Sequence, residues 1–139
     1  MSGEDSKKLD FLLSVSLPYE LWMLDETFKR LQTPLDDQVI ANALIESFCI
    51  HARQLIDFFE NRQGVRAREY VGGTYAARHT CSLPRELRKK LDEQVAHISK
   101  NRFDAAKIDG SDREHFHRVI LQEALHFAAM LAGVAPKAT

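Results

Sequence analysis

The sequence is poor in cysteine, has no excess of charge of either sign and contains no long apolar run. Its two cysteines, Cys49 and Cys81, are spaced for neither a disulfide framework nor a metal site, so we expect a reducing, cytoplasmic compartment. No apolar stretch approaches the roughly 20 residues that span a bilayer, and the polar start MSGEDSKK does not have the composition of a signal peptide. We therefore expect no membrane association.

The net charge of −1 excludes an overall positive field that would attract nucleic acid. A local basic patch is still compatible with the sequence, because the charges are unevenly distributed. Between positions 62 and 90 the basic residues are Arg62, Arg66, Arg68, Arg78, Arg85, Arg88, Lys89 and Lys90, against Glu69 and Glu86. A solvated surface is the ordinary interpretation of such a segment.

Length and hydrophobic periodicity predict one helical domain. The chain has 139 residues, 45% of them hydrophobic and 28% charged, which is typical of one soluble domain. We place a disordered tail at residues 1–8 and the domain at residues 9–135. Apolar residues recur at helical spacing in about residues 18–32, 33–62, 84–102 and 111–132. The predicted fold is all-α, an antiparallel bundle of four to five helices around one long central helix.

The segment 33–62 is the predicted central helix, because it has two distinct faces. One face is an apolar stripe with His51 in its middle, formed by Ile40, Leu44, Phe48, Leu55, Phe58 and Phe59. The opposite line consists of Glu46, Ile50, Arg53 and Asp57. A long helix with apolar and ionic faces usually contacts other elements on both sides.

Capping signals set the expected ends of two helices. Thr33 is the expected N-cap of the long helix, with Pro34 at its first helical position. The last helix is expected to begin with a capping box at Ser111 and Glu114 and to end before Gly133.

The segment 63–82 shows no helical period and contains Gly72-Gly73. It is long for a connection inside a compact domain, so it is either a functional loop or it contains a short helix. Tyr70 and Tyr75 lie there among arginines, where they would be placed to stack on bases.

Two groups of residues are candidates for chemistry. His51 lies on the apolar stripe, where a histidine is most often a core residue with satisfied nitrogens, and Arg53 and Asp57 are an i,i+4 pair. His97 and Arg102 belong to the third predicted helix. A histidine near an arginine suits phosphodiester cleavage, because the imidazole moves a proton while the guanidinium stabilises charge on the phosphate.

A metal site is not expected. Glu123 and His126 have the Glu-x-x-His spacing of di-iron bundles, and Glu114 and His117 repeat it. Both pairs belong to one helix and lie about 180° apart around it, whereas a di-iron site draws such pairs from different helices. We expect neither a metal nor a cofactor.

Two stretches, IESFCIHARQLIDFF at 45–59 and LDEQVAHISKNRF at 91–103, resemble a family of small bacterial helical proteins near the HEPN superfamily and its abortive-infection branch. The shared motifs are H-A-R-x-L-x-D-F-F and V-A-H-[LI]-[ST]-x-x-R. The resemblance implies a helical bundle, usually dimeric, and in many members a metal-independent ribonuclease of toxin–antitoxin, phage-defence or RNA-processing systems. The matching polar positions are Glu46, His51, Arg53, Asp57, His97 and Arg102.

The chain departs from the HEPN nucleases in one motif. Their arginine is followed, after four to six intervening residues, by a histidine, and no arginine here has that spacing. Arg113 and His117 are one residue too close, and His97 and Arg102 occur in the reverse order.

The leading hypothesis is a homodimer that binds RNA or a nucleotide in a polar cleft between the long helix and the third helix. In its catalytic version, an endoribonuclease without metal, the catalytic residues are His97 as acid or base, Arg102 as phosphate clamp and His51 as alternative proton carrier. Glu46, Arg53 and Asp57 would bind and orient, and an antitoxin would be a further partner. The alternative is a non-catalytic dimeric interaction module, in which buried polar residues fix helix register and the second face of the long helix forms the dimer.

Overall fold

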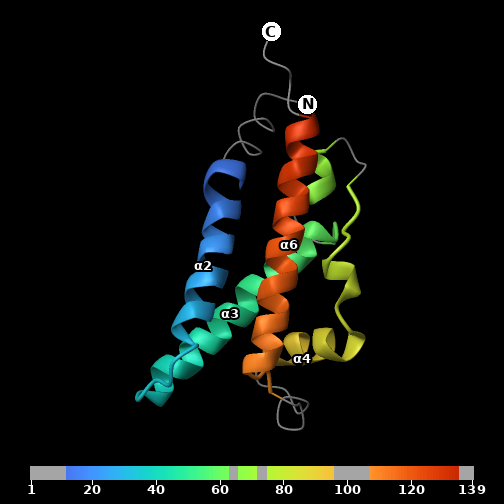
Figure 1. Ribbon diagram of the computed structural model, residues 1–139. Helices are drawn as coiled ribbons and strands as arrows, with labels where there is room; N and C mark the ends of the chain where they lie inside the picture. Colours follow the sequence, from blue (N-terminus) through green and yellow to red (C-terminus); the bar gives the residue numbers. More distant parts are fainter. Residues whose placement is uncertain (1–11, 63–65, 72–74, 96–106, 135–139) are drawn as a thin grey trace.

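The computed structural model describes residues 12–62, 66–71, 75–95 and 107–134, and within them the predicted all-α fold is confirmed (Figure 1). A short π-helical segment, η1 (Leu12–Ser16), precedes the four α-helices α2 (Leu17–Arg30), α3 (Gln38–Phe59), α4 (Arg85–Val95) and α6 (Gly110–Val134). Two 3-10 segments, η2 (Ala67–Glu69) and η3 (Thr80–Ser82), lie between α3 and α4. The described ranges contain no strand, and the predicted tail at 1–8 lies outside them.

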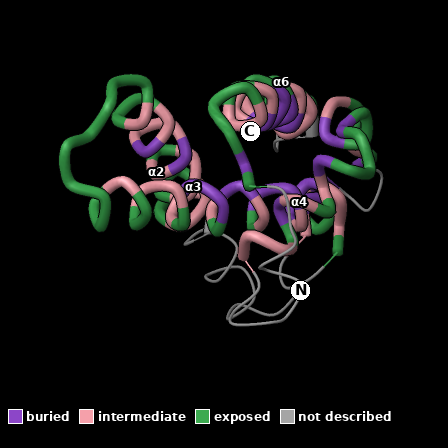
Figure 2. The backbone as a smooth tube through the Cα atoms, turned by 90° about the horizontal axis from the view of Figure 1, so that it is seen from below, coloured by how far each residue is buried: buried purple, intermediate pink, exposed green. Residues whose placement is uncertain are grey.

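The long helix α3 is the central element, as predicted. It packs against α2, α4 and α6, and α6 also packs against α2. In Figure 1, α6 runs in front of α3, and α4 crosses near the foot of α6. Figure 2 shows that the buried residues of α3 and α6 lie on the sides that face each other. The largest side chains of this core are Phe48, Phe59, Phe116, Leu24, Leu55 and Ile120.

The two predicted faces of α3 are confirmed along most of its length. Phe48, Leu55, Phe58 and Phe59 are buried in the core. Ile40 was expected on the same stripe but is 52% exposed. The reason is its position, because the first turns of α3 extend beyond the other helices at the lower left of Figure 1.

The predicted start of α3 is wrong by several residues. The helix begins at Gln38, and the Asp37 carboxylate caps it by accepting the backbone N–H groups of Val39 (2.9 Å) and Ile40 (3.2 Å). Thr33 and Pro34 therefore belong to the turn between α2 and α3. A capping carboxylate that satisfies two free N–H groups is the stronger start signal.

The capping box of α6 is also placed differently from the prediction. Asp109 Oδ1 accepts the N–H of Asp112 (2.8 Å), and Asp112 Oδ2 accepts the N–H of Asp109 (3.2 Å). The reciprocal pair is therefore Asp109 with Asp112, not Ser111 with Glu114. The expected end before Gly133 is wrong as well, because the helix continues to Val134. The third predicted helix is described as α4 up to Val95, and its extension to residue 102 lies outside the described ranges.

Candidate functional site

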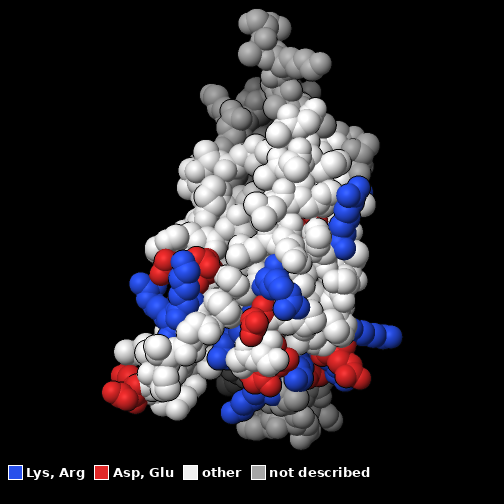
Figure 3. All heavy atoms as spheres, in the orientation of Figure 1, with Lys and Arg blue, Asp and Glu red and all other residues white. Residues whose placement is uncertain are grey.

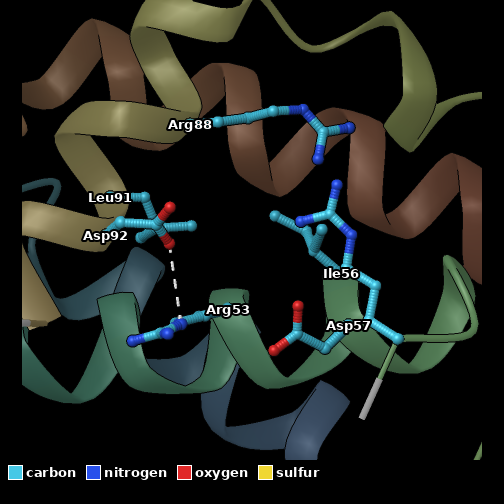
Figure 4. Close-up of a pocket in the computed structure, with 7 residues that line it drawn as sticks. Arg53, Ile56, Asp57, Arg88, Leu91 and Asp92 are labelled. Atoms are coloured by element: carbon cyan, nitrogen blue, oxygen red, sulfur yellow. Dashed lines mark ion pairs between the residues drawn. The ribbon is translucent and has the colours of Figure 1, made fainter.

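A small pocket lies between the second half of α3 and helix α4 (Figure 4). Arg53 and Asp57 reach into it from α3, and Arg88 and Asp92 from α4. Ile56, Arg62 and Leu91 complete its lining. Two of the predicted orienting residues, Arg53 and Asp57, are thus brought together at the α3–α4 boundary. The cavity volume of about 20 Å³ is room for about one water molecule, so it is too small to enclose a nucleotide.

The charged groups of this pocket compensate one another. Arg53 Nε lies 3.6 Å from Asp92 Oδ1, as the dashed line in Figure 4 marks. Burial raises the pKa of Asp57 above its ordinary value, although Arg53 and Arg62 act in the opposite direction. Glu46 is an exposed residue of the same helix and does not line the pocket. The pocket lining thus contains three guanidinium groups, those of Arg53, Arg62 and Arg88, and two carboxylates, those of Asp57 and Asp92.

Arg88 holds three segments together beside this pocket. Its guanidinium donates to both oxygens of Glu60, with Nη1 at 2.8 Å from Oε1, and to the carbonyl of Thr80 (2.6 Å). Glu60 also lies 3.4 Å from Arg62. Burial alone would raise the pKa of Glu60, but the hydrogen bonds from Arg88 lower it below the ordinary value. The pair therefore fixes the end of α3 against α4 and η3.

His51 lies on a different side of α3 from the pocket. Its Nδ1 pairs with the Glu20 carboxylate of α2, and its side chain is 12% exposed. The ring of Tyr19 packs edge-on against it with the ring centres 5.8 Å apart. The Gln54 amide lies 2.8 Å from Glu20 Oε1 and donates to it when its nitrogen faces that carboxylate. His51 is therefore a largely buried bridge between α3 and α2 through its Nδ1, in line with its position on the apolar stripe.

A second histidine fastens α2 to α6. His117 Nε2 lies 2.8 Å from Asp25 Oδ1, and its ring stacks on Phe28 with centres 3.9 Å apart and planes 9° from parallel. Asp25 also pairs with Lys29 at 2.7 Å. The hydrogen bond from Lys29, and after it that from His117, lowers the pKa of Asp25.

The most deeply placed charge in the described chain is Glu123 of α6, which is 0% exposed. Its Oε1 accepts the backbone N–H groups of Arg78 (3.0 Å), His79 (2.8 Å) and Thr80 (3.0 Å). Its Oε2 accepts the hydroxyl of Tyr75. Burial alone would raise the pKa of Glu123, but these donors lower it, whereas burial and the nearby carboxylate raise the pKa of Tyr75.

The structure changes the interpretation of three residues. Tyr75 is 4% exposed and donates to Glu123, so it is not available to stack on bases. Tyr70 packs against Phe58 and Phe127. Glu123 has its oxygens occupied by protein donors, and the described residues contain no group of three or more His, Cys, Asp or Glu side chains that could hold a metal ion.

His97 and Arg102, the proposed acid or base and phosphate clamp, lie outside the described residues. Their roles stay predictions. No protein-family model, curated protein sequence or solved structure matches the chain. No described helix is long and apolar enough to cross a membrane.

Part of one face of the molecule shows no charged side chain. In Figure 3 the charged side chains gather over the lower half, and the middle of the upper half, over the second half of α6 and the first half of α2, shows none. Residues 119–134 of α6 contain one charged residue, Glu123, and it is buried. Leu125 on this helix is 73% exposed and Trp22 on α2 is 56% exposed. Trp22 is therefore a surface residue and not part of the core.

The sequence contained a weak signal for the Glu123 network. Glu123 lies on the same line as Phe116, Ile120 and Phe127, three and four residues from its neighbours. A carboxylate on an apolar stripe must find donors when it is buried. The identity of those donors was not predictable, because they lie 43 to 48 residues earlier in the chain.

Proposed function

We propose that this chain is a non-catalytic helical interaction module that acts as a homodimer. The observation that carries the proposal is the uncharged outer side of α6, where Leu125 is 73% exposed. The other side of this helix packs into the core. Contiguous exposed apolar surface on a soluble domain commonly marks a protein-binding site.

The polar residues support the same proposal, because they hold helices together. Glu123 anchors the loop 75–82 to α6, Arg88 joins α4 to the end of α3, and His51 and His117 fasten α2. Groups engaged in this way fix helix register. A catalytic group, by contrast, needs an approach for substrate and a free position for proton transfer.

The experiment is sedimentation velocity over a range of protein concentrations, with two matched variants. Leu125→Glu places a charge on the uncharged face, and Val39→Glu places one on an apolar residue of similar exposure, 76%, at the free end of α3. We expect wild type and Val39→Glu to dimerise as concentration rises and Leu125→Glu to stay monomeric. A wild-type chain that is monomeric throughout would contradict the proposal.

A second candidate function is binding of the RNA backbone at the pocket of Figure 4, which one observation favours. Arg53, Arg62 and Arg88 line one pocket, and arginine is the residue best suited to phosphate groups. The test is binding of a labelled single-stranded RNA at 50 mM and 200 mM salt in the double variant Arg53→Gln/Arg62→Gln, since each lost phosphate contact makes the salt dependence less steep. Arg30→Gln, on the exposed Arg30–Glu26 pair of α2, is the control.

If RNA is bound, cleavage is a separate question. The resemblance assigns it to His97, Arg102 and His51, so His97→Ala and His51→Ala are the variants to assay for loss of cleavage. An antitoxin partner belongs to this candidate function and not to the interaction module.

A further inference from the structure

The outer side of the second half of α6 carries a regular apolar stripe. Its members are Leu121, Leu125, Ala128 and Ala132, spaced by four, three and four residues. At about 100° per residue these four positions fall within about 60° of the helix circumference. This spacing is that of the seam between two packed helices. The opposite side of α6 is occupied by the core residues Phe116, Ile120 and Phe127.

The stripe has a direction, with large residues first and small residues second. When two copies of such a stripe run antiparallel, with the twofold axis between positions 125 and 128, Leu121 meets Ala132 of the other copy. Leu125 then meets Ala128 of the other copy in the same way. Each large side chain lies against a small one, so the two helices approach closely without gaps. A parallel pair would place leucine against leucine and alanine against alanine.

We infer that α6 pairs antiparallel with α6 of a second copy of this chain through this stripe. The inference rests on the proposed function and names its partner and geometry. A twofold interface must be self-complementary, and the reciprocal order of leucine and alanine satisfies that condition. The face carries no exposed charge between positions 119 and 133, so association leaves no charge of either copy desolvated and unpaired.

The area of the face determines how strong this dimer is. A 14-residue stretch of helix is about 21 Å long and about 10 Å wide with its side chains. The footprint of this stretch alone is therefore roughly 200 Å² on each copy, and the neighbouring helix α2 adds to it. A stable dimer of standard size buries about 800 Å² on each partner. The dimer is therefore weak, and the fraction of dimer depends on protein concentration.

Cysteine cross-linking tests the geometry. The background is Cys81→Ser, because Cys81 is the exposed native thiol, whereas Cys49 is buried and its pKa is raised by burial to about 12, which keeps it unreactive. One full-length chain carries Leu121→Cys and an affinity tag, and the other carries Ala132→Cys. The two are mixed above the dimerisation concentration and oxidised.

In the antiparallel arrangement positions 121 and 132 of different copies are adjacent, whereas two copies of position 121 are about 16 Å apart along the axis. Cysteines whose Cα atoms are more than about 7 Å apart do not bridge. We expect disulfide-linked dimers containing one chain of each kind in the mixture, and almost none when either chain is oxidised alone. Circular dichroism and sedimentation of the reduced variants show whether each is folded and associates like the parent.

The outcomes separate the inference from the proposed function. Cross-linking of each variant with itself, in preference to the mixture, would overturn the antiparallel stripe in favour of a parallel one. Dimers by sedimentation without preferential mixed cross-linking would overturn the stripe and leave the interaction module standing. A monomer at every concentration would overturn both.

Discussion

Tyr75 donates its hydroxyl hydrogen to Glu123 across the interface between the α3–α4 connection and α6. The same carboxylate accepts three successive backbone N–H groups, from Arg78 to Thr80. The connection 75–82 is thus anchored to one buried charge of another element, in addition to the local turn contacts that His79 and Thr80 make with Ser82 and Leu83. The stability of this loop therefore depends on its contacts with α6.

Replacing Glu123 should therefore destabilise the fold strongly. In Glu123→Ala the three N–H groups and the Tyr75 hydroxyl lose their acceptor in a buried place, and each unsatisfied buried group costs about 1–3 kcal/mol. We expect a loss of at least about 3 kcal/mol in the free energy of unfolding, measured by urea denaturation. Tyr75→Phe, which removes one donor and no acceptor, should lose only about 1–2 kcal/mol. Equal losses in the two variants would contradict this account.

Acid should destabilise the protein through its engaged carboxylates. The pKa values of Glu60 and Glu123 are lowered in the folded protein relative to 4.5, so the unfolded chain binds their protons more readily. Their contribution to stability is fully present above the unfolded pKa and is lost as the pH falls through the folded pKa. Between about pH 5 and pH 3 the free energy of unfolding should fall. The fall should be shallower in Glu123→Gln, and an unchanged slope in that variant would assign the acid sensitivity to other groups.

Asp57 should behave in the opposite way. Burial raises its pKa in the folded protein, so the folded chain binds this proton more readily than the unfolded chain. The ionised form is then a cost to stability at neutral pH, and the cost disappears as the pH falls below the unfolded pKa. We expect Asp57→Asn to be more stable than wild type at pH 7 and equal to it in acid. Chemical denaturation at the two pH values measures the difference.

The Glu60–Arg88 pair should show strong coupling in a double-mutant cycle. Arg88→Met leaves Glu60 half-buried with only the more distant Arg62 at 3.4 Å, and it removes the donor to the Thr80 carbonyl. We expect a loss of about 2–4 kcal/mol. Glu60→Gln/Arg88→Met should lose less than the sum of the two single variants, because no uncompensated charge is left. Additive losses in thermal or urea unfolding would show that the two residues act independently.

The pairing of His117 combines two interactions that substitution can separate. His117→Phe keeps an aromatic ring stacked on Phe28 and loses the hydrogen bond to Asp25, which retains Lys29 at 2.7 Å. That variant should lose about 0.5–1.5 kcal/mol. His117→Ala removes the stacked ring as well, so its free energy of unfolding should fall by about a further 0.5–1.5 kcal/mol. Hydrogen exchange in α2 should increase in the same order, and equal losses in the two variants would mean that the stacked ring adds no measurable stability.

The helices and the faces of α3 were predictable from sequence, because helical periodicity depends on residues three and four positions apart. Phe48, Leu55 and Phe59 repeat at that spacing and are buried. The start of α3 was not predictable in the same way, since Thr33-Pro34 and Asp37 are two capping signals only a few residues apart. Asp37 prevails because its carboxylate reaches the N–H groups of both Val39 and Ile40.

The site was predictable only where it is local. Arg53 and Asp57 are one helical turn apart, and the structure places both in one pocket. The contacts that organise the rest join residues far apart in sequence, such as His117 with Asp25 and Arg88 with Glu60. Nothing in the neighbourhood of either partner specifies the other, so these pairs required the tertiary structure.

The distance along the chain between Glu123 and its donors also has a consequence for synthesis. Thr80 is made 43 positions before the carboxylate that it binds, and chains grow at about 5–20 residues per second. Glu123 is therefore synthesised roughly 2–9 seconds after the segment 75–82. The separation is shorter in the α2–α3 hairpin, where Glu20 and His51 are 31 positions apart. During that interval the N–H donors in the segment 75–82 lack the Glu123 acceptor, and slow codons placed between the two segments would lengthen it.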